Sequence, residues 1–589
     1  MANADEENEI CLADEIIDGR KCLNTKIQYR RKYEHFRKWI ADKHPECLNA
    51  ASITVNLPTI SKQNLKDFFS YICKKKGKNG EFLEPEVYQT FQHVSGYKSA
   101  IKDHFASENV DFGIDIEKMF TQFFGGYQRK IASLKQDGVM SIIEGKQPLS
   151  FKGYKFLSDK ATDQFEDYPT SIFARFFLIM CWNLIARCVS VGSLMYNHIS
   201  WENDSLVVVF PSHKGDKDGL RSLKKHVYAN VAEPSICPIL SFAIYLFTRG
   251  YDRQDAKTTV FAGDSESRFS KWLLKLCAEH KELLTNQGID ISMIGTHSFR
   301  KGIATFLSGT PGGPTAIAIY LRAGWSLGPV QSRYILEGEG GDQVCGRAAT
   351  GLPLTDVTFA NLPAHFLADD TGMTSDDWQD ILPGYATFYP LGFREVMPYL
   401  LASLVHHRDH LIQLQAHHPR HPLFNQRVWT SGILERLQGR VGTGCNRNPI
   451  SKLFATGVPP HLVLANRFVE LERRVGCMDV NLTTRIDVMK VEMKTVLEGL
   501  PEAVKNNMLQ NFRVDGVIPI TQLQIADMME SMKSQILAAM QMLIVSNAPQ
   551  VPAILPDVGG GRSDGTGGYS QWTWKSRFHP VPESFIFPK

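Results

Sequence analysis

Polar residues suited to phosphate binding or catalysis lie in apolar surroundings between residues 187 and 334 of this 589-residue chain. In order they are Arg187, Lys214, His297, Arg300, Trp325 and Tyr334. Arg187 stands in the most apolar stretch, where a guanidinium is costly to bury unless it meets a carboxylate or a phosphate. Alone, Arg187 suits a structural ion pair equally well, and about one His-x-x-Arg motif is expected by chance. The order of all six is therefore the informative feature.

This order resembles that of the tyrosine recombinase (phage integrase) family. In that family a helical arginine precedes a lysine in a β-hairpin, and His-x-x-Arg, Gly-His or Gly-Trp, and a tyrosine follow. Here His297 follows Arg187 by 110 positions (297 − 187 = 110), and Tyr334 follows Trp325 by nine (334 − 325 = 9). The likeness covers about residues 22–350. The local sequence of the motifs most resembles that of the crypton branch of eukaryotic mobile elements. The segments that carry this likeness are His297-Ser-Phe-Arg-Lys-Gly, Arg322-Ala-Gly-Trp, Arg333-Tyr-Ile and Gly341-Asp-Gln-Val-Cys-Gly-Arg.

The resemblance implies a DNA strand transferase that needs neither metal nor ATP nor any other cofactor. Tyr334 is expected to attack the phosphodiester and form a 3′-phosphotyrosyl bond, which conserves the energy needed for religation. Arg187 and Arg300 are expected to bind the non-bridging oxygens through forked donors that stay protonated.

The remaining members have proton-transfer and positioning roles in the family. Lys214 is expected to protonate the departing 5′-oxygen, and Lys217 at the same turn is the reserve candidate. His297 is expected to act as a general acid or base, or as a phosphate donor. Trp325 is expected to donate its indole N–H to the phosphate. One position departs from the family: Ser190 stands where many members carry a carboxylate, which casts doubt on how firmly the first arginine is oriented.

The elements that must position these residues are mainly helical. Apolar stripes predict a helical DNA-clasping domain over residues 22–140, and a helix is expected over 173–194. The β-branched run at 206–210 and residues 222–227 predict a hairpin within an α+β catalytic domain at 146–350. The fold class is therefore mainly α with a small β-hairpin or sheet.

Charge is distributed unevenly along the chain. Residues 1–20 carry a net charge of −6 and read as an acidic disordered tail (1–21), whereas residues 21–150 sum to +7. A basic cluster of this kind is expected to bind phosphates, although a solvated helix face explains it equally well. The candidate DNA-binding residues are Arg30, Arg31, Lys32, Lys74, Lys75, Lys76 and Lys78. The lysine run at 74–78 also suits nuclear import.

Residues 365–545 are expected to be helical. From Leu464 to Leu500, apolar residues recur mostly in steps of four and three, and a shorter seam runs over 525–543. An intermolecular coiled coil and two helices of a small bundle explain them equally well. Six histidines between 406 and 421 are not favoured as a metal site, because Pro419 and Pro422 disrupt the helix. Residues 559–568 form a Gly-rich linker, and 569–589 resemble the truncated start of a DNA-binding domain.

Composition excludes disordered, collagenous and fibrous chains, since 43% of the residues are hydrophobic and 22% are charged. No apolar run is long enough for a membrane span, and the 11 scattered cysteines fit a reducing compartment. The resemblance, rather than composition, implies a nuclear protein whose partner is double-stranded DNA, without a small-molecule substrate, assembling as a homotetramer on DNA. A domesticated DNA-binding protein and a type IB-topoisomerase-like enzyme remain alternatives.

Overall fold

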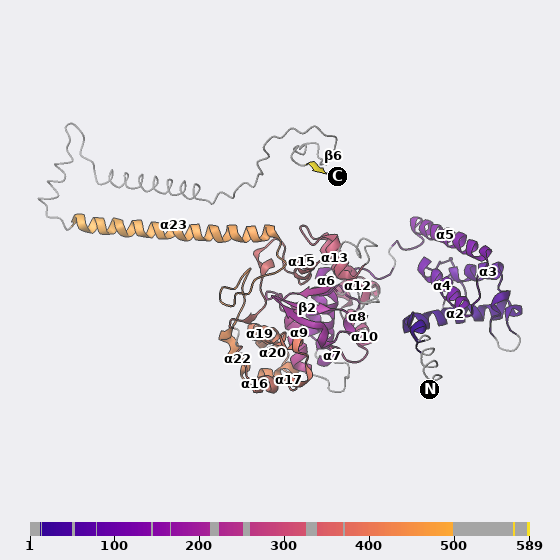
Figure 1. Ribbon diagram of the computed structural model, residues 1–589, viewed down its shortest axis with the longest axis horizontal. Helices are drawn as coiled ribbons and strands as arrows, with labels where there is room; N and C mark the ends of the chain where they lie inside the picture. The colour runs from indigo at the N-terminus through magenta and orange to yellow at the C-terminus, as the bar shows by residue number, and fades with distance from the viewer. Residues whose placement is uncertain are drawn as a thin grey trace. The chain divides into compact units, whose positions relative to one another are not determined.

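The computed structural model describes residues 12, 15–49, 54–77, 79–142, 145–164, 167–211, 223–250, 259–325, 338–368, 371–498, 569–571 and 586–588. The chain is mainly α-helical with a small antiparallel sheet, which confirms the predicted fold class (Figure 1). It divides into two compact units, Met1–Glu470 and Leu471–Lys589. In the described part of the chain, no helix is both long and apolar enough to cross a membrane.

The N-terminal helices enclose a hydrophobic core of their own. They are α2 (Leu23–Lys43), α3 (Lys62–Cys73), α4 (Phe91–Ser107) and α5 (Ile114–Gln136), with 3-10 turns at Pro45–Cys47 and Leu57–Thr59. Phe36 and Phe68 are fully buried and meet edge to face, with ring centroids 4.9 Å apart. The helix α3 begins at a capping box in which Ser61 and Asn64 satisfy each other's backbone N–H groups. Aromatic packing and capping together fix this helical cluster.

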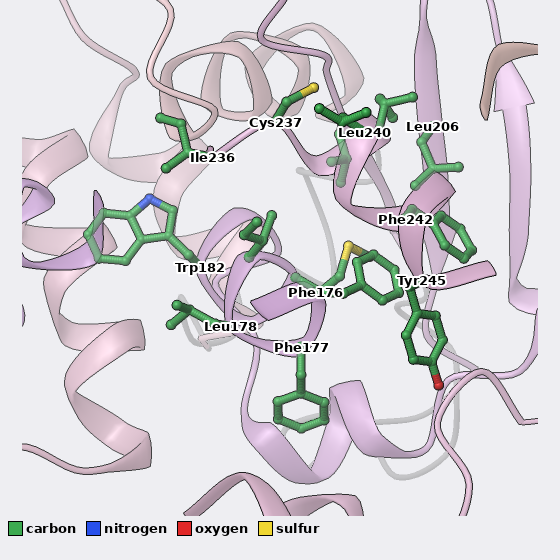
Figure 2. Packing of buried hydrophobic residues seen from close by; sticks show 14 of the residues in the cluster. Phe176, Phe177, Leu178, Trp182, Leu206, Ile236, Cys237, Leu240, Phe242 and Tyr245 are labelled. Atoms are coloured by element: carbon green, nitrogen blue, oxygen red, sulfur yellow. The ribbon is translucent and has the colours of Figure 1, made fainter. Parts of the chain in front are cut away.

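A second hydrophobic core surrounds the helix α7 (Tyr168–Asn183), whose residues are almost all buried. Its neighbours are α6 (Phe151–Thr162), α9 (Pro238–Arg249), α10 (Ser265–Glu279) and α12 (Thr296–Gly309). Figure 2 shows Phe176 and Trp182 of α7 among Leu240, Phe242 and other residues of this core. The rings of Phe176 and Phe242 stack with centroids 4.6 Å apart. This nearly complete burial explains why α7 is apolar on all of its faces.

The sheet has the strand order β1-β2-β3 and is antiparallel throughout. Its strands are β1 (Ile199–Glu202), β2 (Ser205–Val209) and β3 (Lys224–Val227). Leu206 pairs with Val227, so the hairpin predicted from the β-branched run is present. The strand β1 was not predicted; it precedes β2 by a two-residue turn at Asn203, whose φ is +52°. Residues 212–222, between β2 and β3, lie outside the described residues.

The predicted helix over 173–194 is broken. α7 ends at Asn183, and a separate short helix, α8 (Cys188–Gly192), starts five residues later. Between them Ile185 adopts a left-handed backbone with a φ of +48°. A β-branched residue is strained in this region and stays there only when surrounding contacts hold it. Apolar periodicity alone gave no sign of this turn.

The helices that follow complete the second core, which extends to Leu462. They are α11 (Lys281–Asn286), α13 (Ala316–Ala323), α15 (Glu339–Ala349), α16 (Ser375–Ile381), α17 (Tyr385–Phe388), α18 (Leu391–Arg394), α19 (Met397–His406), α20 (Arg408–His417), α21 (Arg427–Thr430) and α22 (Ile433–Leu437). The short strands β4 (His365–Phe366) and β5 (Val441–Gly442) pair antiparallel. Five 3-10 turns lie at Tyr196–His198, Ile291–Met293, Val357–Ala360, Pro422–Asn425 and Gln438–Arg440.

The helix α23 (Pro460–Glu498) is the longest of the described helices, at 39 residues (Figure 1). Further along the chain, β6 (Tyr569–Gln571) pairs with β7 (Ile586–Pro588). The second predicted seam at 525–543 and the Gly-rich segment at 559–568 lie outside the described residues.

Candidate active site

Arg187 is presented by the turn between α7 and α8. It is the N-cap residue of α8, and its side chain is half-buried. Within the turn, Ile185 donates its N–H to the carbonyl oxygen of Trp182 at 3.1 Å, and Ala186 donates to that of Cys181 at 3.3 Å. These bonds fold the chain back on the end of α7. They place the arginine outside the helix in which the sequence predicted it.

His297 and Arg300 lie one helical turn apart in the first turns of α12. Positions three apart share a helix face; here the side chain of His297 is exposed and that of Arg300 is only 8% exposed. Gly302 brings α12 close to the chain before α6, because a Cβ built on it would lie 2.1 Å from the carbonyl oxygen of Leu149. Only glycine permits this approach. It sets how deeply the helix carrying His297 and Arg300 is seated.

Trp325 is brought against Arg300 by the end of α13. Gly324 caps that helix in a left-handed conformation with a φ of +64°, and Trp325 donates its N–H to the carbonyl oxygen of Tyr320 at 2.9 Å. The turn leaves the carbonyl of Ala323 free to accept a hydrogen bond from Nη2 of Arg300. The Arg300 guanidinium then lies 5.4 Å from the centre of the Trp325 ring, within cation–π range.

Arg187 and Arg300 share one positive region. Burial, and next the charge of Arg187, lowers the pKa of Arg300 to about 10. Within the described residues, neither guanidinium forms an ion pair with a carboxylate. By contrast, Arg322 pairs with Asp342 and Arg347 with Asp204. A buried cation without a carboxylate is costly unless an anion binds to it, so this pair of arginines suits an anionic ligand such as a phosphate.

Lys225 is a basic residue of this region that the sequence reasoning missed. It lies in β3, is 7% exposed, and sits with its Nζ 4.8 Å from the centre of the Phe210 ring. Burial is the main cause that lowers the pKa of Lys225 to about 7. The charge of Arg322 follows, partly offset by Asp342, and Arg300 and Arg187 lower it further. A second lysine in the predicted hairpin was the available signal, but its depth depends on tertiary packing.

Two predicted catalytic positions cannot be placed, because Lys214, with its reserve Lys217, and Tyr334 lie outside the described residues. Ser190, the departure from the family pattern, lies in α8 and is half-buried, and its carbonyl oxygen accepts a hydrogen bond from Ser193. The structure therefore brings Arg187, Arg300 and Trp325 together, with His297 one turn from Arg300.

Buried polar side chains hold the backbone just before Arg187. Arg322 donates from Nε and Nη2 to the carbonyl oxygen of Asn183, at 3.1 and 2.8 Å. Lys225 donates from Nζ to the carbonyl oxygen of Leu184 at 3.3 Å. These contacts satisfy carbonyl groups that the end of α7 leaves without intrahelical partners. They also pin the strained turn at Ile185 on its N-terminal side.

Asp342 of α15 anchors this network. Its Oδ1 accepts from Nη1 of Arg322 at 2.6 Å, and its Oδ2 accepts from the backbone N–H of His226 at 2.7 Å. Burial by itself raises the pKa of Asp342, but the charge of Arg322 and the hydrogen bonds from His226 outweigh it, so the pKa lies below its ordinary value. The turn that presents Arg187 is thus tied to the helix that begins five residues after Tyr334.

Glu202, His226 and Glu339 are the one set of potential metal donors that converge among the described residues, with ligand atoms within 4.8 Å of one another. Lys224 already donates to Glu202 at 2.8 Å, and this bond raises the pKa of Lys224. Its ammonium group lies 2.8 Å from each carboxylate oxygen of Glu202 and so already supplies that carboxylate with a counter-charge. We therefore interpret the cluster as an ion-pair network.

The basic residues predicted to contact DNA divide into two groups. Arg30, Arg31 and Lys76 are exposed, although Lys76 also lies 4.5 Å from the centre of the Tyr71 ring. Lys32 is turned inward: it donates to the carbonyl oxygen of His93 at 3.0 Å, and burial lowers its pKa.

The rest of the lysine run is placed in part. Lys74 forms an ion pair with Glu86, and Lys75 is half-buried. Lys78 lies outside the described residues. Charge counting thus located a basic segment, but it did not separate side chains that face solvent from those already paired.

No protein-family model matches the sequence, and no curated protein matches it. Among solved structures, the chain is similar to the XerH site-specific recombinase bound to its difH substrate in a pre-cleavage complex. That match has 12% identity and a TM-score of 0.31, and it covers 53% of this chain and 76% of the other.

Two further structures are similar at the same level. XerA recombinase matches at 12% identity and a TM-score of 0.23, covering 55% of this chain and 90% of the other. A mutant of Flpe in complex with a DNA Holliday junction matches at 13% identity and a TM-score of 0.29, covering 65% of this chain and 97% of the other.

Proposed function

We propose that this chain is a tyrosine recombinase-type DNA strand transferase. The observation that carries the proposal is the pair Arg187 and Arg300, which share a positive region and have no carboxylate partner within the described residues. They come from elements more than a hundred positions apart, and they occupy the positions at which the motif order requires phosphate-binding arginines. By contrast, Arg322 and Arg347 each meet a buried carboxylate.

The proposed reaction is a transesterification. The hydroxyl oxygen of Tyr334 attacks the phosphorus, the bond from phosphorus to the 5′-oxygen breaks, and a 3′-phosphotyrosyl bond forms. Arg187 and Arg300 stabilise the charge that builds on the non-bridging oxygens. Trp325 closes one side of the Arg300 guanidinium, and its indole N–H is a further phosphate donor. Reversal with a new 5′-hydroxyl rejoins the strands.

Proton transfer completes the proposal. Lys214, with Lys217 in reserve, protonates the departing 5′-oxygen, and His297 exchanges protons near the nucleophile. His297 suits this role, because its side chain is exposed one turn from the buried Arg300. Lys225 contacts the carbonyl of Leu184 and is assigned here to positioning the Arg187 turn.

The wider proposal concerns the biological setting. The helical domain at 22–140 would clasp duplex DNA opposite the catalytic domain, and exposed Arg30 and Arg31 are its best-placed phosphate contacts. Recombination breaks four strands in pairs, which implies a tetramer on DNA. The sequence resemblance supports a crypton-like mobile element as the source, and the lysine run at 74–78 supports nuclear localisation.

The decisive experiment traps the covalent intermediate. The full-length protein is incubated with nicked duplexes, including a randomised library and sequences flanking the gene, and adducts are resolved under denaturing conditions. We expect an adduct that Tyr334→Phe abolishes while DNA binding stays nearly unchanged. Tyr320→Phe is the matched control: it keeps the ring that packs on Trp325 at 5.1 Å, so the adduct should persist.

Other outcomes separate the alternatives. DNA binding without an adduct on any sequence would contradict the enzymatic proposal and leave a domesticated DNA-binding protein. Adduct formation with supercoil relaxation by a monomer, without a preferred site, would indicate a topoisomerase-like enzyme. Synapsis at defined sequences would support the recombinase.

A further inference from the structure

The helix α23 carries a continuous apolar stripe that faces solvent. Leu464, Phe468, Leu471, Val475 and Met478 follow one another in alternating steps of four and three, and each is between 42% and 68% exposed. Single exposed apolar residues are ordinary, but a stripe of large side chains along one helix face marks an interaction surface. Alternation of four and three is the repeat of a coiled coil.

The spacing assigns a heptad register to this stripe. Phe468, Val475 and Leu482 take the a positions, and Leu464, Leu471 and Met478 take the d positions. A β-branched residue at a with leucine at d favours two-stranded coiled coils, as Val475 and Leu471 provide. We call the stretch from Leu464 to Leu482 the seam. Past Leu482 the repeat slips: the next a position is Ile486, four residues further on instead of seven, and Met489 follows it at d.

The charges beside the seam are complementary to those of a second copy. The g positions are Arg467 and Arg474, and the e positions are Glu472 and Asp479; all four are exposed. In a parallel pair of helices, each g residue faces the e residue five positions further along the partner. Arg467 then faces Glu472 of the second copy, and Arg474 faces its Asp479.

An antiparallel pair would set like charges against each other. There, g positions face g positions and e positions face e positions, so the arginines would meet arginines and the acids would meet acids. Beyond the slip, Arg485 at g and Lys490 at e repel each other in the parallel arrangement, which limits the favourable part of the interface to the seam.

We infer that α23 forms a parallel two-stranded coiled coil with a second copy of this chain through the seam from Leu464 to Leu482. The partner of the seam is a second copy, because each g arginine is followed five positions later by an e acid. Two identical parallel helices therefore present opposite charges to each other. This dimer needs neither DNA nor the active site. It is therefore independent of the proposed strand transfer, although it would supply half of the tetramer that recombination requires.

The first test compares two identical substitutions on opposite faces of the helix. Val475→Asp places a charge in the seam, whereas Val480→Asp changes a residue that is 65% exposed at the f position, away from it. The molar mass of the full-length protein is measured without DNA by light scattering and sedimentation over a wide concentration range. We expect a dimer in wild type and in Val480→Asp, and a dimer affinity weakened about 100-fold or more in Val475→Asp.

The second test addresses orientation through charge. Arg474→Glu would set a carboxylate against Asp479 on both sides of the dimer and weaken it about fivefold. Adding Asp479→Arg to the same chain restores opposite charges and should return the affinity to that of wild type. A dimer weakened further by the second change would contradict the parallel register.

The third test fixes the register by cross-linking. Leu471→Cys in a Cys477→Ser background should form an intermolecular disulfide under mild oxidation, because identical d residues face each other in a parallel dimer.

Several results would overturn the inference. The wild-type chain could be monomeric at all concentrations. The dimer could persist in Val475→Asp, or be lost equally in both aspartate variants. The protein could also be monomeric, with Val475→Asp lowering its thermal stability more than Val480→Asp does. That result would show that another part of the same chain covers the seam.

Discussion

Arg322 and Asp342 form a buried ion pair, with Nη1 of the arginine 2.6 Å from Oδ1 of the aspartate. The same guanidinium donates to the carbonyl oxygen of Asn183, the last residue of α7, which directly precedes the turn that ends at Arg187. Where many tyrosine recombinases carry a carboxylate three residues after the first arginine, this chain has Ser190. We interpret the Arg322 network as the device that orients the turn here.

Asp342→Asn should destabilise the protein. The guanidinium of Arg322, 1% exposed, would lose its carboxylate, and removing one partner of a buried pair costs about 3 kcal/mol. The free energy of unfolding is measured by denaturant titration with tryptophan fluorescence. Asp380→Asn is the control, since it breaks the exposed pair with Arg427 and should cost no more than about 0.5 kcal/mol. Equal losses in the two variants would contradict the buried network.

Lys225 should make stability depend on pH above neutrality. Its pKa is about 7 in the folded protein, below its ordinary value, so the unfolded chain binds the proton more tightly. Stability should therefore rise with pH between about 7 and about 10, where the folded lysine is neutral and the unfolded one is still charged. Unfolding free energies at pH 7 and pH 9 test this. Lys225→Met should remove the part of this rise that Lys225 contributes in the wild-type protein. Lys224→Met should keep the full rise.

Gly302→Ala should disturb the site through α12. The new methyl group would lie 2.1 Å from the carbonyl oxygen of Leu149, so α12 must shift, at a cost of about 2 kcal/mol. Covalent DNA adducts should form more slowly, because Arg300 moves with the helix. In Gly309→Ala the added methyl group meets nothing within 4 Å, so stability and rate should stay close to wild type. An unchanged adduct rate in Gly302→Ala would show that the depth of α12 does not set the site.

The role of each lysine can be separated with a substrate whose 5′-bridging oxygen is replaced by sulfur. A thiolate leaves without a proton, since thiols are far stronger acids than alcohols. Lys214→Ala should slow cleavage of ordinary DNA about 100-fold or more. On the sulfur substrate, the cleavage rate of this variant should return to that of wild type. Lys225→Ala should remain slow on both, because its loss disturbs the Arg187 turn. Rescue of Lys225→Ala or Lys217→Ala instead would reassign the general acid.

Sequence patterns predicted the elements that local periodicity encodes. The aromatic stripe of α3 and the β-branched run of β2 report which face is buried, because side-chain spacing follows backbone geometry directly. The strained turn at Ile185 gave no such signal, since its residues are as apolar as the helix before them. The motif order from Arg187 to Tyr334 was also readable, because spacing along the chain is all that it requires.

Tertiary structure decided which buried charges are paired. In the sequence, apolar residues surround all three of Arg187, Arg300 and Arg322. In the structure, only Arg322 of these three meets an aspartate. Lys225 likewise stands in an ordinary strand, and its depth among the arginines follows from how β3 packs on α15. The partner of a buried charge comes from a distant segment, and the free energy of burying it depends on that partner. Sequence alone thus named the residue types of the candidate site, and packing alone distinguished Arg187 and Arg300, which have no carboxylate partner among the described residues, from Arg322, which has one.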